Sequence, residues 1–304
     1  TCANPCLIRV IRVPPLLNDL SIKINIMKNI LSFFALAFLL SCNLSKDIEI
    51  DLPEYDRQPV VECYLEPGKP FRLLMTRSYA FFDTLGLSSN FLQNTLLDSA
   101  LVTISYNGQT DTLKNQFVPV LNPVKFFNYV GDNLVPATPG TEFVLNIRLA
   151  EGGEITATTT MLPKVAIDSI VVEFSAELDT LARMLTYITD DQNQENFYRR
   201  LLNYSSLDSF PDQDFLVTDR FSQTALIAFA TGYELAEGDT VFNTIYHVTR
   251  DYYDFAESVQ LAVSGNLNPF AQPSPIKSNV RGSANPIGIF TPLVYDRDTT
   301  IVHK

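Results

Sequence analysis

The alternation of apolar and polar residues along the first half of the chain is typical of β-strands. Between Pro59 and Pro163, short alternating or β-branched runs are separated by turn residues. Asn107-Gly108 is the commonest sequence of a two-residue type I′ hairpin. Short strands with turns at this spacing predict an Ig-like antiparallel β-sandwich over residues 42–163. The predicted strands cover residues 60–65, 71–78, 99–106, 110–113, 142–149 and 155–161.

Leu162-Pro163 marks the predicted start of a second, β-rich domain over residues 164–304. Its predicted strands are 165–174 and 287–295, and a polar turn is expected at 189–196. The helical period appears once, over residues 251–263, where Thr249 or Asp251 can cap the first turn and Gly265 can end the helix. A lone helix beside strands usually covers an open sheet face. The fold class is therefore predicted to be mainly β, with one covering helix. The stripe of this helix is Tyr252, Phe255, Val259 and Ala262.

A different apolar run, Ile30 to Leu40, lies near the start of the chain between Met27-Lys28-Asn29 and Ser41-Cys42. The run is about half as long as the roughly 20 residues that a membrane-spanning helix needs, and it suits the apolar core of a signal peptide. A basic residue, an apolar run, a small residue and a cysteine are the layout of a bacterial lipoprotein signal peptide. We therefore predict a signal peptide over 27–41 and lipid attachment at Cys42.

The residues around this signal carry two further expectations. Residues 1–26 lack a clean helical or strand period, and we expect them to be a mis-annotated leader before Met27. After Cys42, the acids Asp47, Glu49 and Asp51 alternate with apolar residues. They are either a surface-export signal or the solvent face of a first strand. The predicted location is therefore a membrane, to which the lipid holds the protein.

Charge and composition narrow the chemistry. The net charge is −12 over 304 residues, and it is more negative without the first 41 residues. Such a surface repels nucleic acid and anionic headgroups, so no nucleic acid binding is expected and the lipid alone is expected to hold the protein on the membrane. Cys63 lies in an apolar run and is expected to be buried and inert. With two histidines and no catalytic signature, no cofactor or metal site is predicted.

Two stretches offer candidate functional residues. The long segment 79–98 is rich in aromatic residues, which either face a ligand or partner or cap the sandwich. Asp190 and Asp191 form a carboxylate pair of the kind that hydrolases use, but sequence cannot place them across a cleft. Their surroundings lack the ligand spacing of a calcium loop, which favours a plain turn. The candidate ligand or partner surface is Tyr79, Phe81, Phe82 and Phe91.

Several short motifs are spread over nearly the whole mature chain. Besides the acidic start after Cys42, they are Val60-Val61-Glu62, Glu66-Pro67-Gly68, Pro139-Gly140-Thr141-Glu142-Phe143, Glu195-Asn196-Phe197-Tyr198-Arg199, Asn268-Pro269-Phe270, Ser278-Asn279-Val280 and Gly288-Ile289-Phe290. Together they resemble the motifs of the Bacteroidota outer-membrane lipoproteins grouped as domain-of-unknown-function family 4249. The chain departs from the family pattern at 282–286, where a Gly-rich run is usual. The resemblance implies an outer-membrane lipoprotein, often encoded beside a TonB-dependent transporter, with no known catalytic residues. The side of the outer membrane on which such a protein lies, periplasmic or cell-surface, stays open.

Three classes of function remain open at this stage. The favoured hypothesis is a non-catalytic accessory or ligand-capture subunit of a TonB-dependent transporter. The alternative is a structural or adhesive envelope lipoprotein without a small-molecule ligand. A hydrolase is the least favoured, because no catalytic signature accompanies the carboxylates. The absence of Trp, the usual platform for sugars, weakens a purely glycan-specific version of the first hypothesis.

Overall fold

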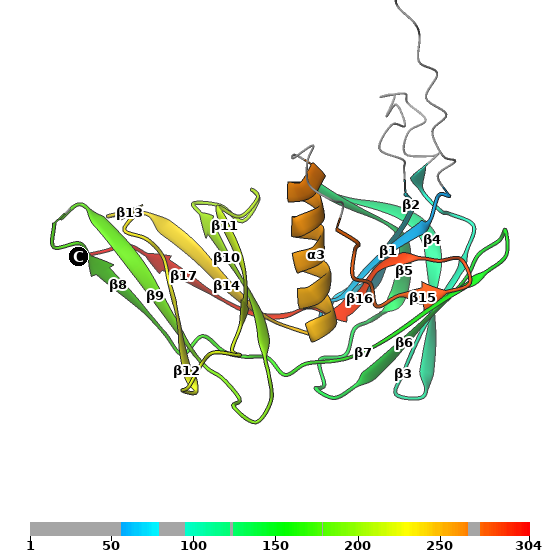
Figure 1. The fold of residues 1–304 in the computed structure, drawn as a ribbon, viewed down its shortest axis with the longest axis horizontal. Helices are drawn as coiled ribbons and strands as arrows, with labels where there is room; N and C mark the ends of the chain where they lie inside the picture. The colour runs from blue at the N-terminus through cyan, green and yellow to red at the C-terminus, as the bar shows by residue number, and fades with distance from the viewer. Residues whose placement is uncertain (1–55, 79–94, 122–123, 178, 267–273) are drawn as a thin grey trace, which may run out of the picture. The chain divides into compact units, whose positions relative to one another are not determined.

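The computed structural model describes residues 56–78, 95–121, 124–177, 179–266 and 274–304 (Figure 1). These residues form strands β1–β17 and helix α3, which confirms the predicted mainly β fold with one helix. Within the described ranges, no helix combines the length and the apolar character needed to cross a membrane. The predicted signal peptide, Cys42 and the alternating segment after it lie outside the described residues.

One sheet of nine strands combines the first seven strands of the described chain with two strands from near its end. Its strand order is β15-β7-β6-β3-β4-β5-β2-β1-β16. All neighbours run antiparallel except β1 and β16, which are parallel. The strands are β1 (Pro59–Leu65), β2 (Pro70–Arg77), β3 (Leu101–Tyr106), β4 (Gln109–Leu121), β5 (Val124–Leu134), β6 (Glu142–Arg148), β7 (Glu154–Thr160), β15 (Arg281–Gly282) and β16 (Ile287–Pro292).

The nine-stranded sheet curls around its own apolar core. The ring of Phe71 in β2 lies 5.2 Å from that of Tyr106 in β3 and 6.3 Å from that of Phe143 in β6. The end strand β16 contacts β7, which is the neighbour of β15 at the other end of the strand order, so the sheet is nearly closed. The predicted hairpin is confirmed, since Asn107 and Gly108 have φ of 48° and 73° and join β3 to β4. Strand β5 was not predicted.

Two smaller sheets follow and pack face to face. One has the order β11-β10-β14-β17, and the other has the order β12-β9-β13 with β8 paired to β9. Their shared core joins Ala182 and Met184 of β9 to Leu202 of β10 and Val241 of β14. The strands are β8 (Ser169–Phe174), β9 (Leu181–Thr189), β10 (Phe197–Tyr204), β11 (Gln213–Thr218), β12 (Leu226–Ala230), β13 (Leu235–Ala236), β14 (Thr240–Val248) and β17 (Val294–Ile301).

A buried arginine lies between these two sheets. Arg200 in β10 is only 2% exposed. Its Nε donates to Asn243 in β14 and its Nη2 donates to Thr186 in β9, each over 3.2 Å. The amide of Asn243 also donates to Thr186 over 2.5 Å. Burial lowers the pKa of Arg200 to about 10. This polar network fixes the position of β9 against β10 and β14 through hydrogen bonds.

Helix α3 (Arg250–Asn266) confirms the predicted helix and ends one residue beyond Gly265. Thr249 is its cap, because its Oγ1 accepts from the backbone N–H of Tyr252 over 3.1 Å. Tyr252 packs in an apolar cluster with Phe197 of β10 and Ile289 of β16. The helix therefore contacts both the nine-stranded sheet and β10, and Figure 1 shows it beside β16.

The end of the chain connects the two parts of the fold. The predicted strand 287–295 is two strands, because β16 ends at Pro292 and β17 begins at Val294. β16 pairs with β1 in the first sheet, whereas β17 pairs with β14 in the second. Sheet membership therefore does not follow the division predicted at Leu162-Pro163, since β15 and β16 come late in sequence but belong to the first sheet.

Glycine is required where these late strands join the first sheet. Gly288 has φ of 138° and is opposite Val61 in the parallel pair. A Cβ at this position would lie 1.9 Å from the carbonyl oxygen of Val61. A Cβ at Gly282 would lie 1.8 Å from the carbonyl oxygen of Glu154 in β7. Neither contact can relax by turning a side chain, because the facing atoms belong to the backbone.

We predict that Gly288→Ala weakens the fold. The substitution forces β16 away from β1 and also strains the backbone, which typically costs about 1–3 kcal/mol. Urea unfolding followed by circular dichroism measures the loss. Gly232→Ala is the matched control, because a Cβ there meets nothing within 4 Å. Equal stability of the two variants would contradict the close contact between β1 and β16.

Candidate functional site

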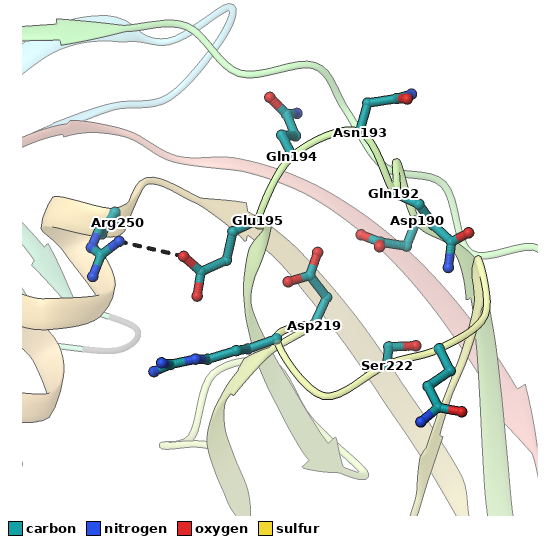
Figure 2. Close-up of a pocket in the computed structure, with 10 residues that line it drawn as sticks. Asp190, Gln192, Asn193, Gln194, Glu195, Asp219, Ser222 and Arg250 are labelled. Carbon is teal, nitrogen blue, oxygen red and sulfur yellow. Dashed lines mark hydrogen bonds and ion pairs between the residues drawn. The ribbon is translucent and has the colours of Figure 1, made fainter.

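A polar hollow of about 740 Å³ lies between the loops at one end of the two smaller sheets. Figure 2 shows residues of the 190–195 loop on one side, residues of the 219–223 loop on the other, and Arg250 facing Glu195. Its lining consists of amides, carboxylates, guanidinium groups and one hydroxyl. The lining residues are Asp190, Gln192, Asn193, Gln194, Glu195, Asp219, Arg220, Ser222, Gln223 and Arg250.

Strand pairing brings these loops together. Phe197, at the start of β10, is opposite the end of β11 on one side and the end of β14 on the other. The end of β9 likewise pairs with the start of β12. The β9–β10 loop, the β11–β12 loop and the first residue of α3 therefore emerge at one end of the sheets. Loops that a rigid sandwich places at one end are a common location of binding sites.

Hydrogen bonds between the loops hold them in place. Asp219 Oδ2 accepts from the backbone N–H of Asn196 over 2.8 Å and from its side-chain amide over 3.1 Å. The same amide donates to the carbonyl of Asp191 over 2.8 Å. The backbone N–H of Asp219 donates back to the carbonyl of Asn196 over 3.2 Å. Asn196 is 3% exposed, so this junction is shielded from water and braces both loops.

A second chain of contacts runs from the hollow into the core. Asp190 is 6% exposed, and its Oδ1 accepts from the hydroxyl of Tyr198 over 2.5 Å. The ring of Tyr198 stacks on His247, with centroids 5.4 Å apart. His247 Nδ1 donates to the carbonyl of Pro163 over 2.9 Å. Burial lowers the pKa of His247, so the imidazole is neutral near pH 7 and supports the ring of Tyr198 without carrying a charge.

The carboxylates of Asp190 and Asp219 converge at the base of the hollow. Burial raises the pKa of Asp190, and the nearby carboxylate of Asp219 raises it further. The hydroxyl of Tyr198 acts in the opposite direction, because it stabilises the ionised carboxylate. Asp219 Oδ1 is buried and has no hydrogen-bond partner. A proton on Asp190 would relieve the repulsion between the two groups.

The rim of the hollow carries charged, aromatic and amide side chains that a bound ligand can contact. Arg250 pairs with Glu195 over 3.3 Å, and its guanidinium carbon lies 5.9 Å from the centroid of the Phe197 ring. Phe221, in the 219–223 loop, is 85% exposed. The amides and the serine hydroxyl of the lining present donors and acceptors together. Such a lining suits a ligand rich in hydroxyl or amide groups, with an aromatic side chain nearby for its apolar face. Among the residues that the structure describes, no group of three or more His, Cys, Asp or Glu is placed to hold a metal ion.

A family model matches residues 45–296, which include the hollow and every described strand except the end of β17. The chain belongs to the family described as Domain of unknown function (DUF4249). The comparison with curated proteins finds no match. Membership of the DUF4249 family confirms the family resemblance of the sequence motifs, and the lipoprotein and transporter roles stay predictions.

Only some of the predicted site residues of this DUF4249 chain lie within the described residues. Tyr79, Phe81, Phe82 and Phe91 lie outside the described residues, as does Cys42. Cys63 is described, and it is free and buried, as expected. Burial raises the pKa of its thiol, so the unreactive thiol form is favoured.

The suggested carboxylate pair is different from the observed one. The predicted turn at 189–196 is confirmed as the β9–β10 loop, but Asp190 and Asp191 do not converge. Asp191 is exposed and accepts from both the backbone N–H and the side chain of Asn193, which lowers its pKa. Asp190 instead meets Asp219, from a loop about 30 residues further along the chain. The mostly polar run Asp219–Gln223, interrupted by Phe221, was the local signal for that second loop.

We predict that Asp190→Asn stabilises the protein at pH 7. Because the folded state raises the pKa of Asp190, this carboxyl favours folding at low pH, and the benefit is lost as pH rises through the folded pKa. An asparagine does not ionise, and its amide can donate to the orphan Oδ1 of Asp219. The expected gain is about 1 kcal/mol at pH 7, and little near pH 4.

Urea unfolding between pH 4 and pH 8 measures this difference. Asp208→Asn, at an exposed loop position, is the control and should leave the pH profile unchanged. If the free energies of unfolding of Asp190→Asn and the native protein differ by the same amount at every pH, the pKa of Asp190 is not raised in the folded state.

Proposed function

We propose that this protein is a lipid-anchored, non-catalytic ligand-capture subunit of the outer membrane that works with a TonB-dependent transporter. In this proposal the hollow between the 190–195 and 219–223 loops binds a polar ligand. The lipid on Cys42 keeps the protein on the membrane. The cargo passes from the hollow to the transporter.

The observation that carries the proposal is a polar lining supported by a rigid base. Asn196 and Asp219 brace the two loops through buried hydrogen bonds, so the loops are organised before a ligand arrives. The amides above this junction point away from the sheet core and remain exposed. Binding to a pre-organised site loses less conformational entropy than binding to flexible loops, which favours affinity for a ligand of matching hydrogen-bond pattern.

The first experiment is a mild-detergent pull-down of tagged protein from outer membranes. We expect a stoichiometric TonB-dependent transporter to copurify with it. The Cys42→Ala variant cannot take the lipid and is expected to leave the membrane fraction. It is therefore the control that shows whether copurification of the transporter needs the lipid anchor. Recovery of the native lipoprotein without a transporter would favour the structural or adhesive role instead.

A second experiment tests the hollow itself. We predict that the double variant Gln192→Ala/Gln223→Ala weakens binding about tenfold, since each lost hydrogen bond contributes about 0.5–1.5 kcal/mol. The probes are neutral oligosaccharides and short uncharged peptides, measured by isothermal titration calorimetry. Gln109→Ala, at the exposed first residue of β4 in the nine-stranded sheet, is the matched control. Unchanged binding in the double variant would remove the hollow as the capture site.

Hydrolysis is the second candidate function, and the convergence of Asp190 and Asp219 is the observation that favours it. Two close carboxylates that share a proton can act together as acid and base. Here, however, Tyr198 and Asn196 engage one oxygen of each group, which suits a structural clamp. Hydrolysis of an oligosaccharide or peptide by the native protein and by Asp219→Asn distinguishes the two roles. An enzyme hydrolyses the probe and loses this activity in Asp219→Asn, whereas a capture protein hydrolyses it in neither form.

A further inference from the structure

A second pocket, of about 400 Å³, lies on the outer face of the nine-stranded sheet. In β1 the residues Val61, Cys63 and Leu65 point into the core, so Glu62 and Tyr64 fall on the opposite face. Tyr252 from α3 and Arg199 from β10 complete the pocket on this face. It shares no lining residue with the polar hollow between the loops.

The carboxylate of Glu62 is half-buried in this pocket. Its Oε2 accepts one hydrogen bond, from the hydroxyl of Tyr64 over 3.2 Å. Among the described residues it forms no ion pair. A carboxylate can accept about four hydrogen bonds, so this group retains unused capacity. Burial raises the pKa of this carboxyl, whereas the hydrogen bond from Tyr64 and the charge of Lys125 act in the opposite direction.

Aromatic rings surround this carboxylate. Tyr64 and Tyr252 meet edge to face, with centroids 6.4 Å apart. Phe126 and Phe127 of β5 line the pocket from the neighbouring part of the sheet. The faces of aromatic rings attract cations, and a carboxylate beside them adds direct charge pairing. The remaining lining includes Leu74 and Leu293, which provide an apolar surface.

The cations of the pocket do not neutralise Glu62. Arg199 is bound by Asp214 through two contacts, of 2.7 Å and 2.5 Å, and it also donates to the hydroxyl of Tyr252. Its charge is therefore already matched. Lys125 is exposed at the rim and lowers the pKa of Glu62 only as the smallest of three effects. The pocket thus offers an under-compensated carboxylate among aromatic rings.

We propose that this pocket binds a small organic ammonium ligand, in which a primary amine is attached to an apolar or aromatic body. The ammonium group donates to the free oxygen of Glu62 and lies against the rings of Tyr64 and Tyr252. The body lies among Phe127, Leu74 and Leu293. A volume of about 400 Å³ is within the range of small-molecule sites, which is about 300–1,000 Å³.

Calorimetric titration of the full chain with matched probes tests this site. The probes are phenethylamine, phenylalanine, 2-phenylethanol and 3-phenylpropionate. We expect the two ammonium compounds to bind and the neutral alcohol and the acid to bind at least about tenfold more weakly, because only an ammonium group can pair with the carboxylate. Comparable binding of 2-phenylethanol, or binding of none of the four, would overturn the proposal.

Variants assign the binding to Glu62. Glu62→Gln keeps the side-chain shape and removes the charge, so it is expected to fold and to lose at least about tenfold in affinity for phenethylamine. Glu142→Gln, at an exposed position of β6, is the control and should bind as the native protein does. Thermal unfolding of each variant confirms the fold. Unchanged affinity in folded Glu62→Gln would overturn the proposal. The double variant of the polar hollow should leave phenethylamine binding intact, which separates this site from the proposed capture site.

Discussion

The described fold depends on one close backbone contact, between Gly288 in β16 and Val61 in β1. A side chain cannot fit there, because a Cβ would lie 1.9 Å from the carbonyl oxygen of Val61. The contact lets a strand from the end of the chain pair in parallel with the first described strand. Parallel pairing needs a long connection, and here the connection contains α3 and every strand of the two smaller sheets except β17, which follows β16. Closure of the first sheet therefore also ties the later elements to it.

The same closure positions α3, on which both pockets depend. Ile289, next to Gly288, packs against Tyr252 in the first turn of the helix. Residues of that turn reach the β9–β10 region twice, through the pair of Arg250 with Glu195 and the bond from Arg199 to Tyr252. The polar hollow and the outer-face pocket thus have walls on one helical turn. The cap from Thr249 holds the geometry of both.

Local signals in the sequence were sufficient for the elements with a clear period. The Asn107-Gly108 hairpin and the strand pattern of β1 follow from turn chemistry and alternation. Strand β14 was missed because it buries polar residues beside apolar ones, including Asn243 and His247, so its alternation is hidden. The paired sheets, the closure by β16 and the encounter of Asp190 with Asp219 depend on contacts between residues far apart in the chain, which no local pattern encodes.

Buried polar groups explain why the strands of the two smaller sheets were harder to predict. The same groups fix the positions of the loops that connect these strands. Arg200 has only neutral partners in its network, so its charge is poorly compensated, and burial lowers its pKa. Removing either neutral partner would leave a buried guanidinium with unmet hydrogen bonds, which destabilises the folded state in a low-dielectric core. The network therefore allows one alignment of β9 with β10 and β14. Because the β9–β10 loop connects two of these strands, that alignment also determines where Asp190 and Asn196 meet the 219–223 loop.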